Sequence, residues 1–261
     1  MKSRLLNGMA SILFIYIFLS TAYADDVYWN ISPDVSECSI EVNPALTQSQ
    51  FHTFTKQAGL IATFKSLSSA EPLGVGNFSF GLDLAYTPID QHDPAWINTF
   101  THPGEECPLG DAVSYPTIRA RMGVLDNMDI GAYFTTAPEA NYGFLAGEVK
   151  YALLRESAGL PAAAVRTSFV SLLGVDDMNM NVYSVDFSVS KRLGIFTPYL
   201  GIRETLAVGT ETTSKVDLDR ENVWTTQGIV GIDCSISRFN VAAEYNVGDV
   251  STFSVATGIR F

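Results

Sequence analysis

Apolar and polar residues alternate at every second position along most of the chain after residue 75. Residues 78–86, for example, run Phe-Ser-Phe-Gly-Leu-Asp-Leu-Ala-Tyr, so large apolar side chains lie on one face of an extended chain and small or polar ones on the other. This period of two is that of a β-strand. Similar segments, separated by Gly, Asn, Asp or Pro, predict ten strands near residues 75–88, 113–124, 127–136, 145–153, 162–173, 183–190, 199–206, 227–233, 239–246 and 253–261.

The links between the predicted strands are of two kinds. Tight links at residues 125–127, 193–195 and 237–238 contrast with long polar links at 89–112 and 208–221. An even strand number, short turns at one end and long loops at the other are typical of an all-β fold, the transmembrane antiparallel up-and-down β-barrel of outer membranes. The first strand would then start in the periplasm, and the last would return there at Phe261.

A soluble β-sandwich would show the same alternation, because its apolar faces pack against each other. The barrel is favoured because the predicted strands have the ~10 to 13 residues that a tilted spanning strand requires. Aromatic residues also gather near the strand ends, where they would form interfacial girdles. These residues are Tyr86, Tyr142, Tyr151, Phe196, Trp224, Tyr245 and Phe261.

The first 24 residues have the features of a secretory signal peptide. Lys2 and Arg4 precede an apolar run at 12–19, and Ala22-Tyr23-Ala24 provides a cleavage site. The apolar run is too short to span a membrane as a helix. We therefore expect export, cleavage after Ala24 and residence in the bacterial outer membrane.

Residues 25–74 precede the predicted barrel and are less regular. Residues 44–59 have helical spacing of apolar residues, with Thr47 as a possible cap and Gly59 as a possible stop. One interpretation is a short periplasmic or lumen-occluding segment before a ten-stranded barrel, and the other turns residues 51–68 into two more strands. We favour ten strands, which divides the chain into a signal peptide (1–24), an N-terminal periplasmic or lumen segment (25–74) and the barrel (75–261).

Composition removes other classes of protein. The formal net charge of −12 offers no basic groove for nucleic acid. A content of 47% apolar residues argues against disorder. After residue 24, polar residues interrupt every apolar stretch before it reaches the ~18 residues of a membrane-spanning helix.

Three cysteines allow at most one disulfide within the chain. Cys38 and Cys107 lie in polar segments that contain Pro, and they are the plausible pair in an oxidising compartment. Cys234 lies within an apolar alternation and is expected to be buried or lipid-facing. A bond between Cys38 and Cys107 in the first outer loop would require the N-terminal segment to pass through the lumen as a plug.

Residues 252–261 resemble the C-terminal insertion signal of Gram-negative outer-membrane proteins, with Phe261 as the final aromatic residue. More widely, residues 147–154, 172–177, 188–191 and 197–201 are similar to an uncharacterised family of proteobacterial outer-membrane β-barrel proteins, and the similarity extends from about Phe51 to Phe261. The resemblance implies the fold and the membrane, but no substrate or catalytic residue. The expected partners are outer-membrane lipid, lipopolysaccharide and, during insertion, the barrel-assembly machinery, and the protein is expected to be a monomer.

Charged residues on the polar faces of the predicted strands are expected to line the lumen. They are Asp83, Arg119, Arg121, Asp129, Glu148, Lys150, Arg166, Asp186, Arg203, Asp233, Glu244 and Arg260. Such charges either form an ion-pair network that fixes strand register or line a small selective pore. Because a ten-stranded lumen is only modestly wider than a filled eight-stranded one, we expect a narrow or plugged channel for small solutes. The alternative is a non-conducting structural or surface-interaction barrel, and an outer-membrane enzyme is a third, less favoured alternative.

The histidines do not suggest an enzyme. His52 lies in the N-terminal segment, and His92 and His102 lie in the long first loop. Adjacent His92 and Asp93 do not make a hydrogen-bonded dyad and are better explained as a turn ahead of Pro94. We expect no catalytic residue, cofactor or metal.

Overall fold

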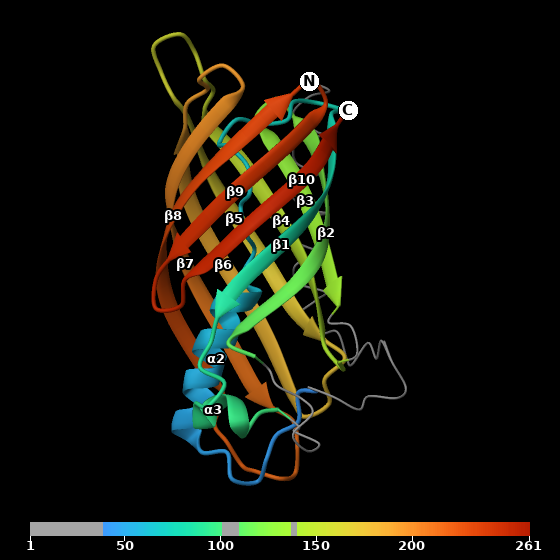
Figure 1. Cartoon of the computed structure of the whole chain (residues 1–261), viewed down its shortest axis with the longest axis vertical. Helices are drawn as coiled ribbons and strands as arrows, with labels where there is room; N and C mark the ends of the chain where they lie inside the picture. The colour runs from blue at the N-terminus through green and yellow to red at the C-terminus, as the bar shows by residue number, and fades with distance from the viewer. Residues whose placement is uncertain (1–38, 101–109, 137–139) are drawn as a thin grey trace, which may run out of the picture. The chain divides into compact units, whose positions relative to one another are not determined.

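The computed structural model describes residues 39–100, 110–136 and 140–261, which belong to one compact unit. Ten antiparallel strands form a closed barrel in which each strand pairs with its sequence neighbours and β1 pairs with β10 (Figure 1). The strands are β1 (Phe78–Pro88), β2 (Ala112–Leu125), β3 (Met128–Thr136), β4 (Gly143–Leu154), β5 (Ala162–Leu173), β6 (Met178–Ser190), β7 (Phe196–Glu211), β8 (Glu221–Ile236), β9 (Phe239–Val247) and β10 (Thr252–Arg260). The ten-stranded prediction is confirmed, and the twelve-stranded alternative is wrong.

The apolar faces of the strands point out of the barrel. Phe80, Leu82 and Leu84 on β1 are 52%, 56% and 47% exposed, whereas the inward-facing Asp129 and Arg166 are 1% exposed. A soluble sandwich would bury the first set and expose the second. The reverse arrangement is that of a β-barrel whose outer surface is solvated by lipid hydrocarbon.

The outer surface differs from the prediction at one aromatic residue. Tyr86, Tyr151, Phe196, Trp224, Tyr245 and Phe261 are all exposed on it. Tyr142 instead packs inside, against Phe100 and Phe144, because it lies in the link before β4 and folds over the end of the lumen. In the part of the chain that the structure describes, no helix is long and apolar enough to cross a membrane.

The two ends of the barrel differ. One end, the tight-turn end, carries the links β2–β3, β4–β5, β6–β7 and β8–β9 and the C-terminus. Left-handed Gly194 (φ 68°) and Ser237 (φ 57°) make two of these turns. The other end, the long-loop end, carries the remaining links, including α3 (Pro94–Ile97) between β1 and β2 (Figure 1). There β7 and β8 extend further than predicted and leave residues 212–220 as the loop.

A helix, α2 (Gln48–Ala62), precedes the barrel strands. The predicted cap is confirmed, because Thr47 and Gln50 form a capping box at its first turn. The helix does not stop at Gly59, however, and continues to Ala62. Gly59 faces β7 so closely that a Cβ atom there would overlap with the Cβ of Ala207. This glycine therefore allows close contact between α2 and the barrel wall and does not end the helix.

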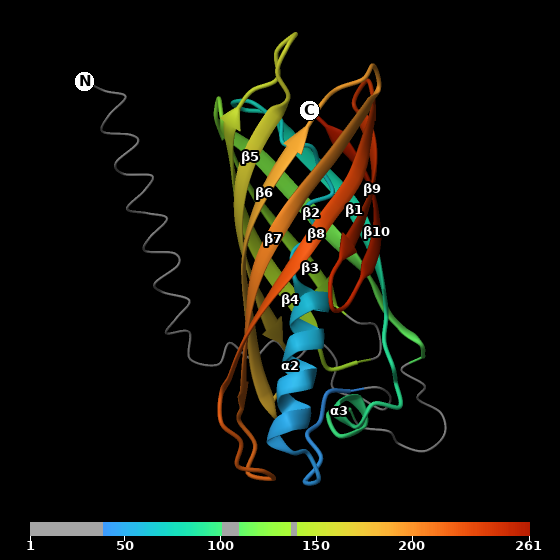
Figure 2. The ribbon, with the colours of Figure 1, turned by 90° about the vertical axis from the view of Figure 1, so that its left-hand side faces the viewer.

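The N-terminal segment passes through the whole lumen. Residues 40–43 bond to residues 98–99 at the long-loop end. From there α2 packs inside the barrel against β6, β7 and β8, and the irregular residues 63–73 continue to the tight-turn end (Figure 2). At that end the backbone nitrogen of Gly76 donates to the carbonyl of Gly123, and β1 begins. We refer to residues 48–73 as the plug.

Candidate functional site

The structure places all twelve predicted lumen charges on the inward face of the barrel. Asp83 and Arg260 are partly exposed, and the other ten are buried: Arg119, Arg121, Asp129, Glu148, Lys150, Arg166, Asp186, Arg203, Asp233 and Glu244. Burial of so many charges requires that each finds a partner, because an unpaired charge in a low-dielectric interior costs several kcal/mol.

Arg166 on β5 lies at the centre of an ion-pair network across five strands. Its guanidinium lies 3.0 Å from Glu148 on β4 and 4.0 Å from Asp186 on β6. Glu148 also pairs with Arg121 at 2.5 Å, and Asp186 pairs with Arg203 at 3.6 Å. Arg166 and Asp186 are direct cross-strand partners, as are Asp186 and Arg203. The network therefore links the register of neighbouring strands.

Six of the remaining charges form three separate pairs, and the seventh, Glu244, bonds to the plug backbone. Asp83 lies 2.9 Å from Arg119, and Asp129 lies 3.0 Å from Lys150. Asp233 and Arg260 pair at 2.5 Å. Six of the twelve wall residues are acidic and six are basic. These wall charges therefore balance.

Three wall side chains, Arg119, Arg121 and Glu244, hold the backbone of Ser66 in the plug. The carbonyl oxygen of Ser66 accepts a hydrogen bond from Arg121 Nη2 at 2.5 Å. The carboxylate of Glu244 accepts from the backbone nitrogens of Ser66 (3.2 Å) and Leu67 (2.7 Å). Tyr199 donates its hydroxyl to the same carboxylate at 3.0 Å. Glu244 is thus oriented by the wall toward the plug.

Further wall contacts hold the plug near the tight-turn end. Lys150 Nζ donates to the carbonyl of Glu71 at 2.8 Å. Asp129 accepts from the backbone nitrogen of Leu73 at 3.0 and 3.1 Å, and Ser190 Oγ accepts from that of Ala70 at 3.1 Å. Several wall residues predicted to line a solute path are therefore occupied by the protein's own chain.

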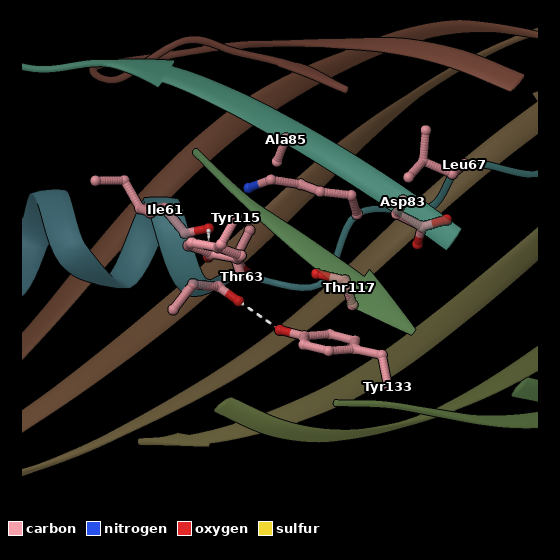
Figure 3. Close-up of a pocket in the computed structure, with 10 residues that line it drawn as sticks. Ile61, Thr63, Leu67, Asp83, Ala85, Tyr115, Thr117 and Tyr133 are labelled. Carbon is pink, nitrogen blue, oxygen red and sulfur yellow. Dashed lines mark hydrogen bonds between the residues drawn. The ribbon is translucent and has the colours of Figure 1, made fainter. Parts of the chain in front are cut away.

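The C-terminal end of α2 is fixed by tyrosines. Tyr115 donates to the carbonyl of Ile61 at 3.1 Å, and Tyr133 donates to that of Ala62 at 2.7 Å (Figure 3). Lys65 turns back and donates to the carbonyl of Leu60 at 2.8 Å. The carbonyls of the last turn of a helix have no hydrogen-bond donors within the helix. These three side chains supply the donors. A cavity of about 30 Å³ beside them has room for roughly one water.

At the long-loop end the plug makes apolar contacts. The ring centroid of Phe54 lies 5.2 Å from that of Trp96, which stacks on Phe100 at 5.6 Å. Tyr115 and Phe144 on the wall join this cluster. The plug is therefore held by apolar packing at one end and by polar contacts along the rest of the lumen.

Sequence patterns did not reveal the plug contacts. The alternation placed Tyr133 and Tyr199 on polar strand faces, but nothing local showed that they would bind α2 or orient Glu244. The signal available was a hydroxyl-bearing aromatic residue on a face otherwise made of small and charged residues. Such a residue is expected to seek a hydrogen-bond partner when buried.

The loop residues also have defined places. Asp93 caps α3, and Asp90 accepts from the backbone of His92, so His92 and Asp93 form the expected turn. His52 pairs with Glu221 at 2.7 Å, and His102 lies outside the described residues. Lys215 bonds to Glu41 and Asp177, and these hydrogen bonds raise the pKa of its ammonium.

Within the described ranges no group of three or more His, Cys, Asp or Glu residues could hold a metal ion. Cys38 and Cys107 lie outside the described residues, so the predicted disulfide stays a prediction. The nearby Ile40 and Phe100 form a β-bridge.

A closed barrel with an apolar outer surface and a charged lumen defines a transmembrane β-barrel of the outer-membrane type, here filled by its own N-terminal plug. No protein-family model matches the sequence, and no curated protein does. Among solved structures, the chain is similar to an outer-membrane channel from Pseudomonas putida F1, with 10% identity, a TM-score of 0.46, and coverage of 76% of this chain and 100% of that one.

Two further solved structures are less similar to the chain. The outer membrane protein OprG from Pseudomonas aeruginosa has 12% identity and a TM-score of 0.33, over 74% of this chain and 99% of that one. The attachment invasion locus protein Ail of Yersinia pestis has 13% identity and a TM-score of 0.29, over 72% of this chain and 99% of that one. These likenesses concern the barrel fold alone.

Proposed function

We propose that the protein is an outer-membrane channel for small solutes and that its N-terminal plug closes the lumen. The observation that carries the proposal is that the polar wall bonds to a separate chain segment. Buried ion pairs are often no more stabilising than apolar packing of the same volume. A barrel that only needed a filled interior would be served as well by apolar side chains, whereas a path for polar solutes needs a polar wall.

The composition of the plug suits a segment that can leave the lumen. Residues 63–73 read Thr-Phe-Lys-Ser-Leu-Ser-Ser-Ala-Glu-Pro-Leu, and most of their contacts with the wall are hydrogen bonds that water can replace. A ten-stranded lumen freed of this segment suits small solutes. Because the acidic and basic wall residues balance, we expect weak preference between small anions and cations.

A reversible lock tests the proposal. Ala70 of the plug packs in one buried cluster with Ala162 of β5, and Ser190, the cross-strand partner of Ala162, accepts from the backbone of Ala70. In a chain with Cys38, Cys107 and Cys234 changed to Ser, the pair Ala70→Cys and Ala162→Cys should form a disulfide. The matched control carries Ala162→Cys alone.

Planar-bilayer recording of the locked protein should show a closed lumen, with conductance steps appearing after reduction. The single-cysteine control should behave alike with and without reductant. Steps in the locked state would show a path that bypasses the plug. Silence in both states would instead favour the alternative, a non-conducting structural or surface-interaction barrel.

The proposal includes the route of the protein to the membrane. Residues 1–24 would direct export in a Gram-negative bacterium and be cleaved, and the barrel-assembly machinery would insert the chain as a monomer in contact with lipid and lipopolysaccharide. The last residue supports this role, because Phe261 exchanges backbone hydrogen bonds with Phe78 at 3.1 and 2.9 Å and so helps to close the barrel. Its side chain is 59% exposed on the outer surface.

A further inference from the structure

We infer that the lumen wall is a binding slot for a peptide backbone, and that the solutes of the channel are short, unstructured peptides. The inference rests on the proposed function and names its substrate class. It follows from how the wall holds residues 63–73 of the plug, which are neither helix nor strand.

The wall contacts the plug mainly through groups that every peptide has. Its side chains bond to the backbone carbonyls of Ile61, Ala62, Ser66, Ser69 and Glu71 and to the backbone nitrogens of Ser66, Leu67, Ala70 and Leu73. Along residues 63–73, fewer strand side chains bond to plug side chains: Arg203 to Ser66 Oγ, Arg166 to Ser68 Oγ, and Thr205 to Thr63 Oγ1. Glu221 of β8 also bonds to the side chains of Gln48 and His52 in α2. Recognition through the main chain gives affinity that depends little on sequence.

Donors and acceptors alternate along the slot. Arg121 and Lys150 donate to carbonyls, and Glu244 and Asp129 accept from backbone nitrogens. The Glu244 and Asp129 positions are six plug residues apart, at Leu67 and Leu73, so the backbone between them spans at most ~20 Å. It bends at Leu67, where φ is 42°. A simple anion accepts hydrogen bonds only, so it would satisfy the wall donors and leave the wall acceptors unpaired. A peptide of about seven residues satisfies both.

Small wall residues leave space for peptide side chains. Leu67 packs between Ala242 and Ala256, and Ala70 packs with Ala162 and Ala164. A larger wall side chain at these positions would leave room only for a glycine of the bound peptide. The alanines therefore let the slot accept small and medium side chains while the charged residues hold the backbone.

The test measures binding of a synthetic peptide to the full chain that carries the Ala70→Cys and Ala162→Cys lock. A fluorescent peptide with the sequence of residues 63–73 is added in detergent micelles, and its anisotropy is followed before and after reduction. We expect binding only after reduction, when the plug can withdraw. A peptide with the same composition in scrambled order should bind within about threefold of the original.

The decisive probe is a peptide methylated at the backbone nitrogens that correspond to Ser66, Leu67 and Ala70. It keeps every side chain but loses three donors, and it should bind at least tenfold more weakly. Equal binding of the methylated peptide, or no binding by the reduced protein, would overturn the inference. If the reduced protein conducts ions but does not bind the peptide, the channel function is supported and the inference that its solutes are peptides is contradicted. If it binds the peptide but does not conduct, the proposed function fails.

A wall variant provides the complementary measurement. Glu244→Gln weakens the acceptor for two backbone nitrogens and should reduce peptide affinity at least tenfold. The matched control is Asp233→Asn, since the described partners of Asp233 are Arg260 and Ser235 and not the plug. Heat-dependent gel mobility would verify that both variants form barrels. Equal loss in both variants would contradict a slot centred on Glu244.

Discussion

Gly59 of α2 lies against Ala207 of β7 with no room for a side chain between them. The contact fixes the position of α2 along the lumen, and α2 leads directly into residues 63–73. It also shows that the helix and the wall are matched at a single position, where only glycine fits.

Enlarging Gly59 should therefore displace the plug while leaving the barrel intact. Overpacking of a buried contact costs about 1–3 kcal/mol, so Gly59→Val should make residues 48–73 accessible to protease at lower concentration. The control is Gly147→Ala, where an added Cβ would meet only an ordinary contact, 3.9 Å from the carbonyl of Gly131. Equal protease resistance of Gly59→Val and the native protein would contradict the tight contact.

Removal of Asp129 should destabilise the fold more than removal of an exposed carboxylate. Asp129 is 1% exposed, pairs with Lys150 and accepts from Leu73, so Asp129→Ala leaves a buried ammonium without its counter-ion. The expected loss is about 3–5 kcal/mol in urea unfolding of the protein in micelles.

The control for this prediction is Asp249→Ala at the exposed Lys56–Asp249 pair, where the loss should be about 1 kcal/mol or less. The double change Asp129→Leu with Lys150→Met should recover part of the loss, because it removes both buried charges. A double variant less stable than Asp129→Ala would argue that the pair itself stabilises the barrel.

The outer surface can be tested against the soluble alternative. Leu82 lies midway along β1 and is 56% exposed on the outer face. In a bilayer, Leu82→Arg should cost about 2–4 kcal/mol of folding free energy, whereas on a water-exposed surface it would be close to neutral. The measurement is equilibrium unfolding in lipid vesicles, with Ser214→Arg in the exposed loop 212–220 as the control. A neutral Leu82→Arg would place this face outside the hydrocarbon.

The Cys38–Cys107 disulfide stays a prediction that gels can test. Ile40 and Phe100, two and seven residues away in sequence, form a β-bridge, supported by the bond from Glu41 N to Thr99 O at 2.9 Å. Purified protein should migrate differently on reducing and non-reducing gels, and Cys38→Ser should abolish the difference. Persistence of the difference in Cys38→Ser would assign the bond to other cysteines.

The barrel could be predicted from the sequence because each strand alternates between lipid and lumen, so its pattern is local. The lumen charges could be predicted for the same reason. Their partners could not, since Arg166 and Asp186 meet through strand register. The sequence left open whether residues 25–74 lie in the periplasm or occlude the lumen, because residues 63–73 carry no regular strand or helix pattern that determines their path. Gly59 was misinterpreted because a glycine that ends a helix and one that allows close packing look alike in sequence.

The direction of the plug predicts where the N-terminal segment emerges. Ala45 is exposed at the long-loop end, as is Ser214, whereas Ala158 is exposed in the β4–β5 turn at the opposite end. With the long loops outside the cell, single-cysteine variants Ala45→Cys and Ser214→Cys in the Cys-free background should react with a membrane-impermeant maleimide on intact cells. Ala158→Cys should react only after the outer membrane is opened. Labelling of Ala45→Cys only in opened cells, like Ala158→Cys, would place the start of the plug in the periplasm and contradict its path through the lumen.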